Sequence, residues 1–473
     1  MLVHSSLASF GAPVEGGADG VIDALLAVVG SEGTVVAPTF GSSDPVFDPT
    51  RSETSLGAVP SALWRRAGAL RSPHPLASVA ALGGKAAWLI EGHVDAETAH
   101  GEGTPYHRLA EIAGKILLLG VDQDRSTFLH TAEEVARAAY LRPATGSWRE
   151  SSGAVRTKTW PFFPGPHRAF IGIQGWLDER GLCRAVAIRG CVARLMSAAP
   201  LLQALLERLR TEPLLFITDN PNLPDGIRQR ADVLRAELER ERFTLAADSA
   251  AAGRTVEEIM GNLERTGIRH LHLSSINGVP WDRVEERRRA WYLQGLQLAG
   301  IGVSSLRLER PEPKRAAALA RDAGARVVVV PSTAPAELIA ALAREGVSPL
   351  VENVGISGSE AVRLARLPEL AGLDVGIAFN PRAFLRAGEN PFLTTYTRSR
   401  VRLHLSLLYL GDALGSGERV DLGSGLGEIA ELVSMLRASS FGGIMVLEPP
   451  APDRFAEEAA RFSAMLKRVG SPV

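Results

Sequence analysis

The sequence has little of what marks a secreted, membrane-spanning or disulfide-bonded protein. Its 473 residues include two cysteines, Cys183 and Cys191, which are too few for a disulfide framework and too far apart for a CxxC redox or zinc pair. No run of about 18 apolar residues occurs, and the first residues lack a basic segment followed by a long apolar one. We therefore expect a soluble, cytoplasmic protein without a membrane partner, and we expect both cysteines in the core.

An excess of charge of either sign is also absent. The chain has 52 Lys and Arg residues against 53 Asp and Glu residues, which gives a formal net charge of −1 at pH 7. Such a balance provides no broad electrostatic attraction to nucleic acid or to an anionic membrane. We expect a small-molecule partner and no nucleic-acid partner, and a homo-oligomer stays open.

The apolar patterning indicates two domains in succession. The first forty residues follow a strand, helix, strand order, and the strand 116–121 and a helix over 131–139 come later. Residues 143–180 are expected to be irregular, and the aromatic segment 160–167 within them could form a wall for a substrate or a packed loop. Asp, Asn and Pro are dense over 219–225 and mark a boundary. We predict a first domain over 1–218, a linker and leading helix over 219–240, and a second domain over 241–473.

The second domain shows a regular alternation of strand-like and helical segments. Eight apolar, strand-like runs are separated or followed by helical segments: 243–247, 268–274, 303–308, 325–330, 347–351, 375–379, 401–407 and 444–447. Eight such repeats over about 250 residues are what a (β/α)8 barrel requires. An open, doubly wound sheet is the alternative, because strand count alone does not prove closure.

Polar motifs follow several predicted strands of the first domain. They are His4-Ser5-Ser6-Leu7, Pro38-Thr39-Phe40, Arg71-Ser72-Pro73-His74-Pro75 and the segment from Thr127 to Glu134. In α/β sheets, ligands sit beyond the carboxyl ends of the strands. Hydroxyls, an arginine and histidines collected there suit a phosphate-bearing cofactor and a proton-transfer step.

These four motifs, in this order and over residues 2–215, resemble the aminoglycoside 3-N-acetyltransferase family. The resemblance implies a mixed α/β domain that moves an acetyl or other acyl group from acetyl-CoA or another acyl-CoA to a small-molecule amine. It also implies that Ser5, Ser6, Arg71, Ser72 and Thr127 line the CoA groove. By the same resemblance, His130 and Glu133 form the catalytic pair.

The chemistry of the reaction agrees with a histidine and carboxylate pair. An amine is protonated at neutral pH and cannot attack a thioester until a base with a pKa near neutrality removes its proton. A carboxylate on the other ring nitrogen would fix the tautomer of His130 and stabilise its imidazolium form. The alternative is a purely structural role, in which Thr131-x-x-Glu134 is a capping box that starts a helix.

The second domain, over about 240–470, resembles the xylose-isomerase-like family of metal-dependent sugar isomerases and epimerases. The resemblance rests on short motifs at 270–275, 350–353, 379–383, 403–406, 423–427 and 443–448. It implies a divalent metal held by Glu352, His404 and Glu448. The ligand set is incomplete, since Asn380, Ala383 and Leu407 stand where the family has metal-binding or acidic residues, so the sequence favours a metal-free role over a metal site.

The sequence thus predicts an α/β protein with an acetyltransferase-like domain followed by a (β/α)8 barrel. The leading hypothesis is a CoA-dependent N-acyltransferase that acts on an amino sugar, an aminocyclitol or a similar amine, in antibiotic resistance or biosynthesis. The alternative is a sugar isomerase, epimerase or sugar-binding protein that acts through the barrel, with the first domain accessory.

Overall fold

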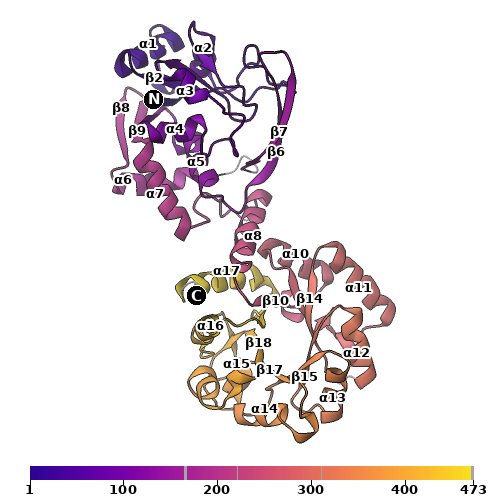
Figure 1. Ribbon diagram of the computed structural model, residues 1–473. Coiled ribbons are helices and arrows are strands. Elements are labelled where there is room, and N and C mark those ends of the chain that lie inside the picture. The colour runs from indigo at the N-terminus through magenta and orange to yellow at the C-terminus, as the bar shows by residue number, and fades with distance from the viewer. Residues whose placement is uncertain (164–167, 221, 310–311, 470–473) are drawn as a thin grey trace. The chain divides into compact units, whose positions relative to one another are not determined.

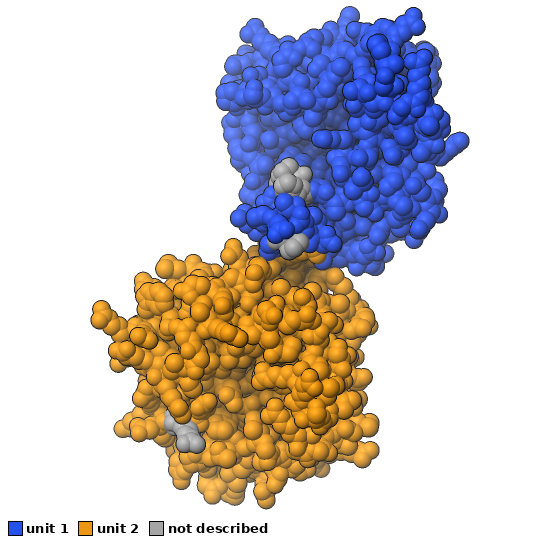
Figure 2. All heavy atoms as spheres, turned by 180° about the vertical axis from the view of Figure 1, so that it is seen from behind, with its two compact units in different colours: residues 1–229 blue, residues 230–473 orange. Residues whose placement is uncertain are grey.

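A computed structural model describes residues 1–163, 168–220, 222–309 and 312–469. The chain forms two compact units, Met1–Gln229 and Arg230–Val473 (Figure 2). The division falls inside helix α8 (Pro224–Leu238), within the segment where the sequence places the linker and its helix. Each unit has its own hydrophobic core.

The N-terminal unit is built on a seven-stranded mixed sheet, as the mixed α/β prediction requires. Its strand order is β3-β4-β2-β1-β5-β9-β8. Strands β2, β1 and β5 are parallel, and the remaining neighbours pair antiparallel. The strands are β1 (Leu2–Ser5), β2 (Thr34–Pro38), β3 (Leu70–Arg71), β4 (Val79–Gly83), β5 (Lys115–Leu119), β8 (Cys183–Ile188) and β9 (Cys191–Ser197).

Helices cover both faces of this sheet (Figure 1). Successive strand residues point to opposite faces, so Leu2 joins the core cluster of one face and Val3 that of the other. Helices α1 (Gly17–Val29) and α2 (Ala58–Arg65) pack on the Val3 face. The Leu2 face is covered by α3 (Ala86–Ile90), α4 (Pro105–Glu111), α5 (Phe128–Val135), α6 (Gln174–Glu179) and α7 (Ala198–Thr211). Cys183 and Cys191 are buried and free, as expected.

The segment predicted to be irregular contains a long hairpin instead. Strands β6 (Arg142–Arg149) and β7 (Val155–Phe162) pair over their full length and lie along one side of the unit (Figure 1). Most of their side chains are exposed, and hydroxyl pairs such as Thr145 with Thr159 replace apolar contacts. The prediction was wrong, because a hairpin with one buried side chain in each strand, Trp148 and Trp160, lacks the apolar alternation by which a strand is recognised.

The C-terminal unit is a closed barrel of eight parallel strands, which confirms the predicted (β/α)8 architecture and excludes an open sheet. Closure comes from β10 and β21, which pair with each other in parallel. The strands are β10 (Thr244–Asp248), β11 (His270–Leu273), β14 (Gly302–Arg307), β15 (Val327–Pro331), β16 (Ser348–Glu352), β17 (Gly376–Phe379), β18 (Leu405–Leu410) and β21 (Ile444–Leu447). The surrounding helices are α10 (Val256–Thr266), α11 (Glu286–Leu298), α12 (Pro313–Asp322), α13 (Ala336–Arg344), α14 (Gly358–Ala365), α15 (Pro381–Arg386), α16 (Ile429–Ala438) and α17 (Phe455–Arg468).

The seventh barrel strand begins later than the sequence predicts. Residues Val401–Leu403 form a 3-10 helix, and β18 starts at Leu405. The apolar pattern runs through the 3-10 helix and the strand alike. The start of the strand is set by its pairing with β17, which begins with Ile377 opposite Leu405. His404 therefore precedes the strand. Within the described ranges, no helix combines the length and apolar character needed to cross a bilayer.

Candidate active site

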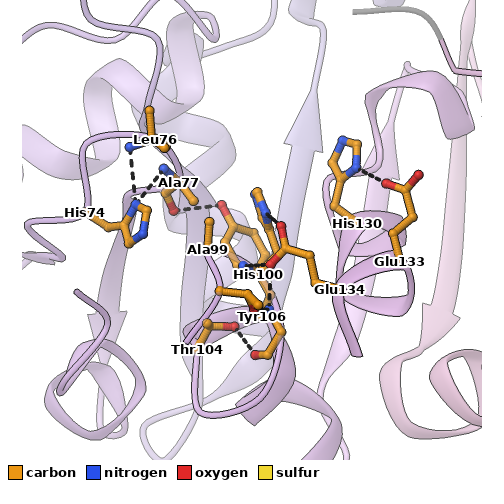
Figure 3. Close-up of polar contacts among 12 residues, drawn as sticks. His74, Leu76, Ala77, Ala99, His100, Thr104, Tyr106, His130, Glu133 and Glu134 are labelled. Atoms are coloured by element: carbon orange, nitrogen blue, oxygen red, sulfur yellow. Dashed lines mark hydrogen bonds and ion pairs between the residues drawn. The ribbon is translucent and has the colours of Figure 1, made fainter. Parts of the chain in front are cut away.

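His130 and Glu133 lie on one face of helix α5, where a spacing of three residues brings side chains together (Figure 3). The Nδ1 atom of His130 is 2.5 Å from Oε2 of Glu133. The helix follows β5 through a short 3-10 turn, Gln123–Arg125, so the pair lies beyond the carboxyl end of a central strand. This is the edge of the sheet at which ligand sites form.

The other carboxylate oxygen of Glu133 is also fully used. Its Oε1 accepts hydrogen bonds from the Tyr140 hydroxyl at 2.7 Å and from Nε of Arg168 at 3.0 Å. Burial alone raises the pKa of Glu133, but His130, Arg168 and Tyr140 together bring that pKa below its ordinary value. Glu133 is therefore a buried anion with three defined partners.

The surroundings of the His130 ring favour its neutral form, because they lower its pKa. Burial lowers its pKa from the ordinary value, and the neighbouring Glu133 offsets that effect only in part. The ring stacks on Phe163, with ring centroids 3.5 Å apart and planes 2° from parallel. Because Nδ1 faces Glu133, Nε2 is the nitrogen left to accept a proton.

A second histidine and glutamate pair lies beside the first (Figure 3). Glu134 contacts Nδ1 of His100 at 2.8 Å through Oε1, and its Oε2 accepts hydrogen bonds from the backbone N–H groups of His100 and Gly101. The rings of His100 and His130 have centroids 5.4 Å apart. The His100 side chain is 1% exposed, whereas that of His130 is 11% exposed, so a substrate reaches His130 more readily.

The capping-box interpretation of Thr131 and Glu134 was wrong. Helix α5 begins at Phe128 with Thr127 as its N-cap residue, so Thr131 lies inside the helix. Glu134 folds back to residues 100 and 101 and not to the helix start. The carboxylate of Glu134 binds backbone N–H groups that are distant in the sequence in place of those at the start of its own helix. The sequence around Glu134 gives no sign of such distant partners.

Ser5, Ser6 and Thr127 lie at the same edge of the sheet. Ser5 ends β1 and is in register with Leu119 at the end of β5, while Ser6 follows it. Both serines are half-buried, and Thr127 is buried at the start of α5. The buried His4 next to them has a pKa lowered to about 3, by burial first and by His130 second, which places it close to the pair.

Arg71 and Ser72 are also near this edge, but their polar atoms are taken up within the protein. Arg71 donates hydrogen bonds to the carbonyl oxygens of Thr39 and Ser52, and it lies over the rings of Phe47 and Trp64. Ser72 is fully buried. Its hydroxyl accepts the Val79 N–H and contacts Nδ1 of His93, so the structure does not present Ser72 to a groove.

The sequence alone did not point to three residues around the pair: His100, Tyr140 and Arg168. Phe163 belongs to the aromatic segment whose role was left open, and it packs on His130, whereas Trp160 is buried in the domain. Residues 164–167 of that segment lie outside the described residues. Tyr140 and Arg168 follow α5 by 5 and 33 positions, and no motif marks them as partners of Glu133.

The three residues expected to hold a metal in the barrel are not brought together. Glu352 ends β16 and Glu448 follows β21, both at the carboxyl end of the barrel, whereas His404 precedes β18 at the amino end. Glu352 is bound by Arg307, and Glu448 by Arg382. Among the described residues, no group of three or more His, Cys, Asp or Glu side chains is arranged to hold a metal ion. These residues therefore do not fit the metal that the resemblance implied.

Comparisons with known proteins show the family of the N-terminal unit. The family model for aminoglycoside 3-N-acetyltransferases matches residues 2–210. Aminoglycoside N(3)-acetyltransferase IV from Salmonella sp is 34% identical over 222 residues, which are 46% of this chain and 83% of the relative. Aminoglycoside N(3)-acetyltransferase IX from Micromonospora chalcea is 37% identical over 158 residues, which are 29% of this chain and 56% of that relative.

Among solved structures, the chain is similar to the complex of AAC-IIIb with CoASH, at 28% identity and a TM-score of 0.41, over 46% of this chain and 91% of that one. The matching family model and the curated relatives show that the N-terminal unit is an acetyltransferase, and its fold has a mixed sheet with a histidine and carboxylate pair at the carboxyl edge. The chain belongs to the aminoglycoside 3-N-acetyltransferase family.

Proposed function

We propose that the N-terminal unit transfers the acetyl group of acetyl-CoA to an amine of an aminoglycoside, with His130 as the general base. Membership of the family supports both the acetyl group and the acceptor, because the relatives carry both in their names. The observation that carries the mechanism is the 2.5 Å contact between His130 Nδ1 and Glu133 Oε2. It leaves Nε2 of a neutral ring to receive a proton.

The proposed reaction is direct transfer, without an acyl-enzyme intermediate. The amine nitrogen forms a bond to the thioester carbonyl carbon while His130 Nε2 takes a proton from the amine. The tetrahedral intermediate then collapses, the carbon–sulfur bond breaks, and the proton on His130 passes to the departing CoA sulfur. The imidazolium that forms in between is stabilised by the buried negative charge of Glu133.

Tyr140 and Arg168 act as positioning residues in this proposal. Both donate to the oxygen of Glu133 that does not face His130, so they fix the carboxylate plane and keep the group ionised. Phe163 stacks on the imidazole and restricts its rotation. A base held in one orientation loses less entropy when the substrate amine arrives.

The acyl-CoA is proposed to lie along the carboxyl edge of the sheet, in contact with Ser5, Ser6 and Thr127. These residues follow β1 and β5, the two neighbouring parallel strands from which the site is built. Arg71 and Ser72 then act indirectly, because Arg71 ties residue 39 to residue 52 and Ser72 supports the turn before β4.

A comparison of two histidine variants tests the proposal. CoA release is measured with acetyl-CoA and a panel of aminoglycosides for His130→Ala and for His107→Ala. His107 also pairs with a glutamate, Glu111 at 3.0 Å, but at the surface of α4. General-base catalysis is worth about a hundredfold to ten-thousandfold in rate, so His130→Ala should lose about that much of kcat while His107→Ala keeps wild-type activity.

Retention of full activity by His130→Ala would refute the assignment of the base. Replacement of acetyl-CoA by propionyl-CoA in the same assay tests the acyl group, because a propionyl donor that reacts as fast would contradict a site specific for acetyl. Absence of CoA release with every aminoglycoside, in a protein that binds acetyl-CoA, would contradict the acceptor class.

A further inference from the structure

The barrel, which lies beyond the end of the matched family model at residue 210, has a polar ring at its carboxyl end. Inside the barrel, the middle layer is largely apolar and includes Ala246, Val329, Leu350, Ala378, Tyr409 and Val446. Because inward-facing positions recur every second residue, the next inward layer follows two residues further along each strand. That layer, called here the mouth ring, consists of Asp248, Ser274, Arg307, Pro331, Glu352, Asn380, Gly411 and Glu448.

The polar members of the mouth ring contact one another. Arg307 Nε is 2.8 Å from Oε2 of Glu352, whose Oε1 accepts a hydrogen bond from the Asn380 amide at 3.1 Å. On another part of the ring, the Ser274 hydroxyl donates to Asp248 at 2.5 Å. Stability alone would favour apolar side chains in such a layer, because burying charges is costly unless each is paired. The composition of the ring therefore indicates a ligand.

Two further arginines reach the ring from outside the eight barrel strands. Arg382, in the first turn of α15, forms an ion pair with Glu448, and its guanidinium packs on Gly411, where any larger residue would meet its Cζ at 3.1 Å. The residue is 4% exposed, yet its Nη1 has no hydrogen-bond partner among the described residues. Arg419 is half-exposed and its Nη2 lies 3.6 Å from Oε1 of Glu448.

The three arginines of this cluster, Arg307, Arg382 and Arg419, face three carboxyl groups, and two of each form close ion pairs. Arg307 is neutralised by Glu352 and Arg382 by Glu448, which leaves Arg419 and Asp248. Burial, and then Glu448, raises the pKa of Asp248 to about 7, so this carboxyl carries only part of a negative charge near neutrality. Burial and the nearby Arg382 lower the pKa of Arg419. A metal cation is disfavoured here because the glutamates already hold arginines.

The glycine-rich segment near the mouth does not offer an alternative anion site. Loops of this kind bind phosphate through backbone N–H groups. Here the N–H groups of Gly423, Gly425 and Gly427 all donate to the carboxylate of Asp412, at 2.8–3.0 Å. Asp412 occupies the place that a phosphate would take, so an anionic ligand has to be held by arginine side chains.

We propose that the mouth ring, together with Arg382 and Arg419, binds a small organic anion without a metal ion, with its carboxylate or phosphate group on Arg382 Nη1 and Arg419. This is a second ligand site, independent of the acetyl-transfer site. Asp248, Ser274 and Asn380 complete it, because they can donate to and accept from hydroxyl groups carried by the same molecule.

Calorimetry on the full chain, after treatment with a chelator, tests this site. The probes are inorganic phosphate, glycerate, glycerol 3-phosphate and uncharged glycerol. We expect at least one anion to bind and glycerol not to bind; glycerate tests a carboxylate ligand, and the two phosphates test a phosphate ligand. Arg419→Gln should weaken binding about tenfold or more, because a charge-assisted contact is lost.

Arg344→Gln is the matched control, since Arg344 is an exposed arginine at the end of α13, on the opposite end of the barrel. It should leave binding unchanged, and both variants should unfold at the wild-type temperature. The proposal is overturned if no anion binds at roughly 10 mM, if binding requires an added divalent metal, or if the two variants weaken binding equally.

Discussion

The imidazole rings of His100 and His130 lie 5.4 Å apart, and each ring is held by its own member of the consecutive pair Glu133 and Glu134. In both pairs a glutamate oxygen contacts Nδ1 of the histidine, but the His130 side chain is more exposed to solvent than that of His100. Glu134 also accepts two backbone N–H groups, which ties α5 to the segment before α4. We infer that the His130 pair performs the chemistry and the His100 pair holds the framework around it.

Glu134→Gln separates these two roles. The neutral amide cannot accept from all three donors, and a buried donor is left without its charged acceptor, so the free energy of unfolding should fall by about 2–4 kcal/mol. The folded fraction should keep kcat within about tenfold of the wild type, because the His130 pair is intact. Urea unfolding and steady-state kinetics at low temperature measure the two effects. A kcat that falls as far as in His130→Ala would contradict the division of roles.

Glu133→Gln should instead change the pH dependence of catalysis. The negative charge of Glu133 raises the pKa of His130, so its removal lets burial lower that pKa further. The acid limb of kcat/KM should therefore move to lower pH, while kcat itself falls about a hundredfold or more because the imidazolium is no longer stabilised. A pH profile of kcat/KM for both proteins measures the shift. An acid limb at the wild-type position would show that Glu133 does not set the pKa of His130.

Acid should destabilise the N-terminal unit through its buried histidines. The pKa of His93 is lowered by burial to about 3, while the unfolded chain titrates near the ordinary value of 6.5. Between these values the unfolded state binds more protons, so the free energy of unfolding should fall as the pH drops from 6.5 towards 3, by up to about 1.4 kcal/mol per pH unit for one group.

His93→Asn tests this linkage. The variant should be less stable than the wild type at neutral pH, because it lacks the contacts of His93 with Ser72 and Ala99. Because the amide of asparagine does not titrate, the free energy of unfolding of the variant should depend less on pH below 6.5. Urea unfolding at pH 7 and pH 4.5 gives both free energies. An equal pH dependence in variant and wild type would contradict the low pKa.

Asp412→Ala should destabilise the barrel strongly. Three glycine N–H groups lose their acceptor at once in a buried position, which at about 1–3 kcal/mol for each unsatisfied donor is a large part of the stability of a domain. In the wild-type protein, a Cβ at Gly427 would lie 2.8 Å from Oδ1 of Asp412, so the close approach of this loop to Asp412 requires glycine. Thermal unfolding of Asp412→Ala and of Asp453→Ala, an acid in the 3-10 turn Pro452–Arg454, gives the comparison. Equal unfolding temperatures would show that the loop does not depend on Asp412.

Local patterns in the sequence determined much of this protein. Apolar runs separated by helical segments predicted the eight barrel strands, because a strand buried on both faces needs an unbroken apolar stretch wherever it pairs. The edge at which these motifs gather was equally predictable, since polar motifs that follow parallel strands meet at one edge of the sheet. The spacing of His130 and Glu133 left their distance open, because the predicted helix began at Thr131; they share a helical face because α5 begins at Phe128.

Only the tertiary structure decided which partners those local elements have. Glu134 could cap its own helix or bind His100. It binds His100, because the fold places the backbone N–H groups of residues 100 and 101 beside its carboxylate. His404 belonged to the apolar pattern of the seventh strand, but the ladder with β17 began one residue later and left it at the amino end. Barrel closure and the arginines on Glu352 and Glu448 are likewise contacts between distant segments. A sequence records periodicity within an element, whereas hydrogen-bond and charge partners are chosen by the packing of elements far apart in the chain.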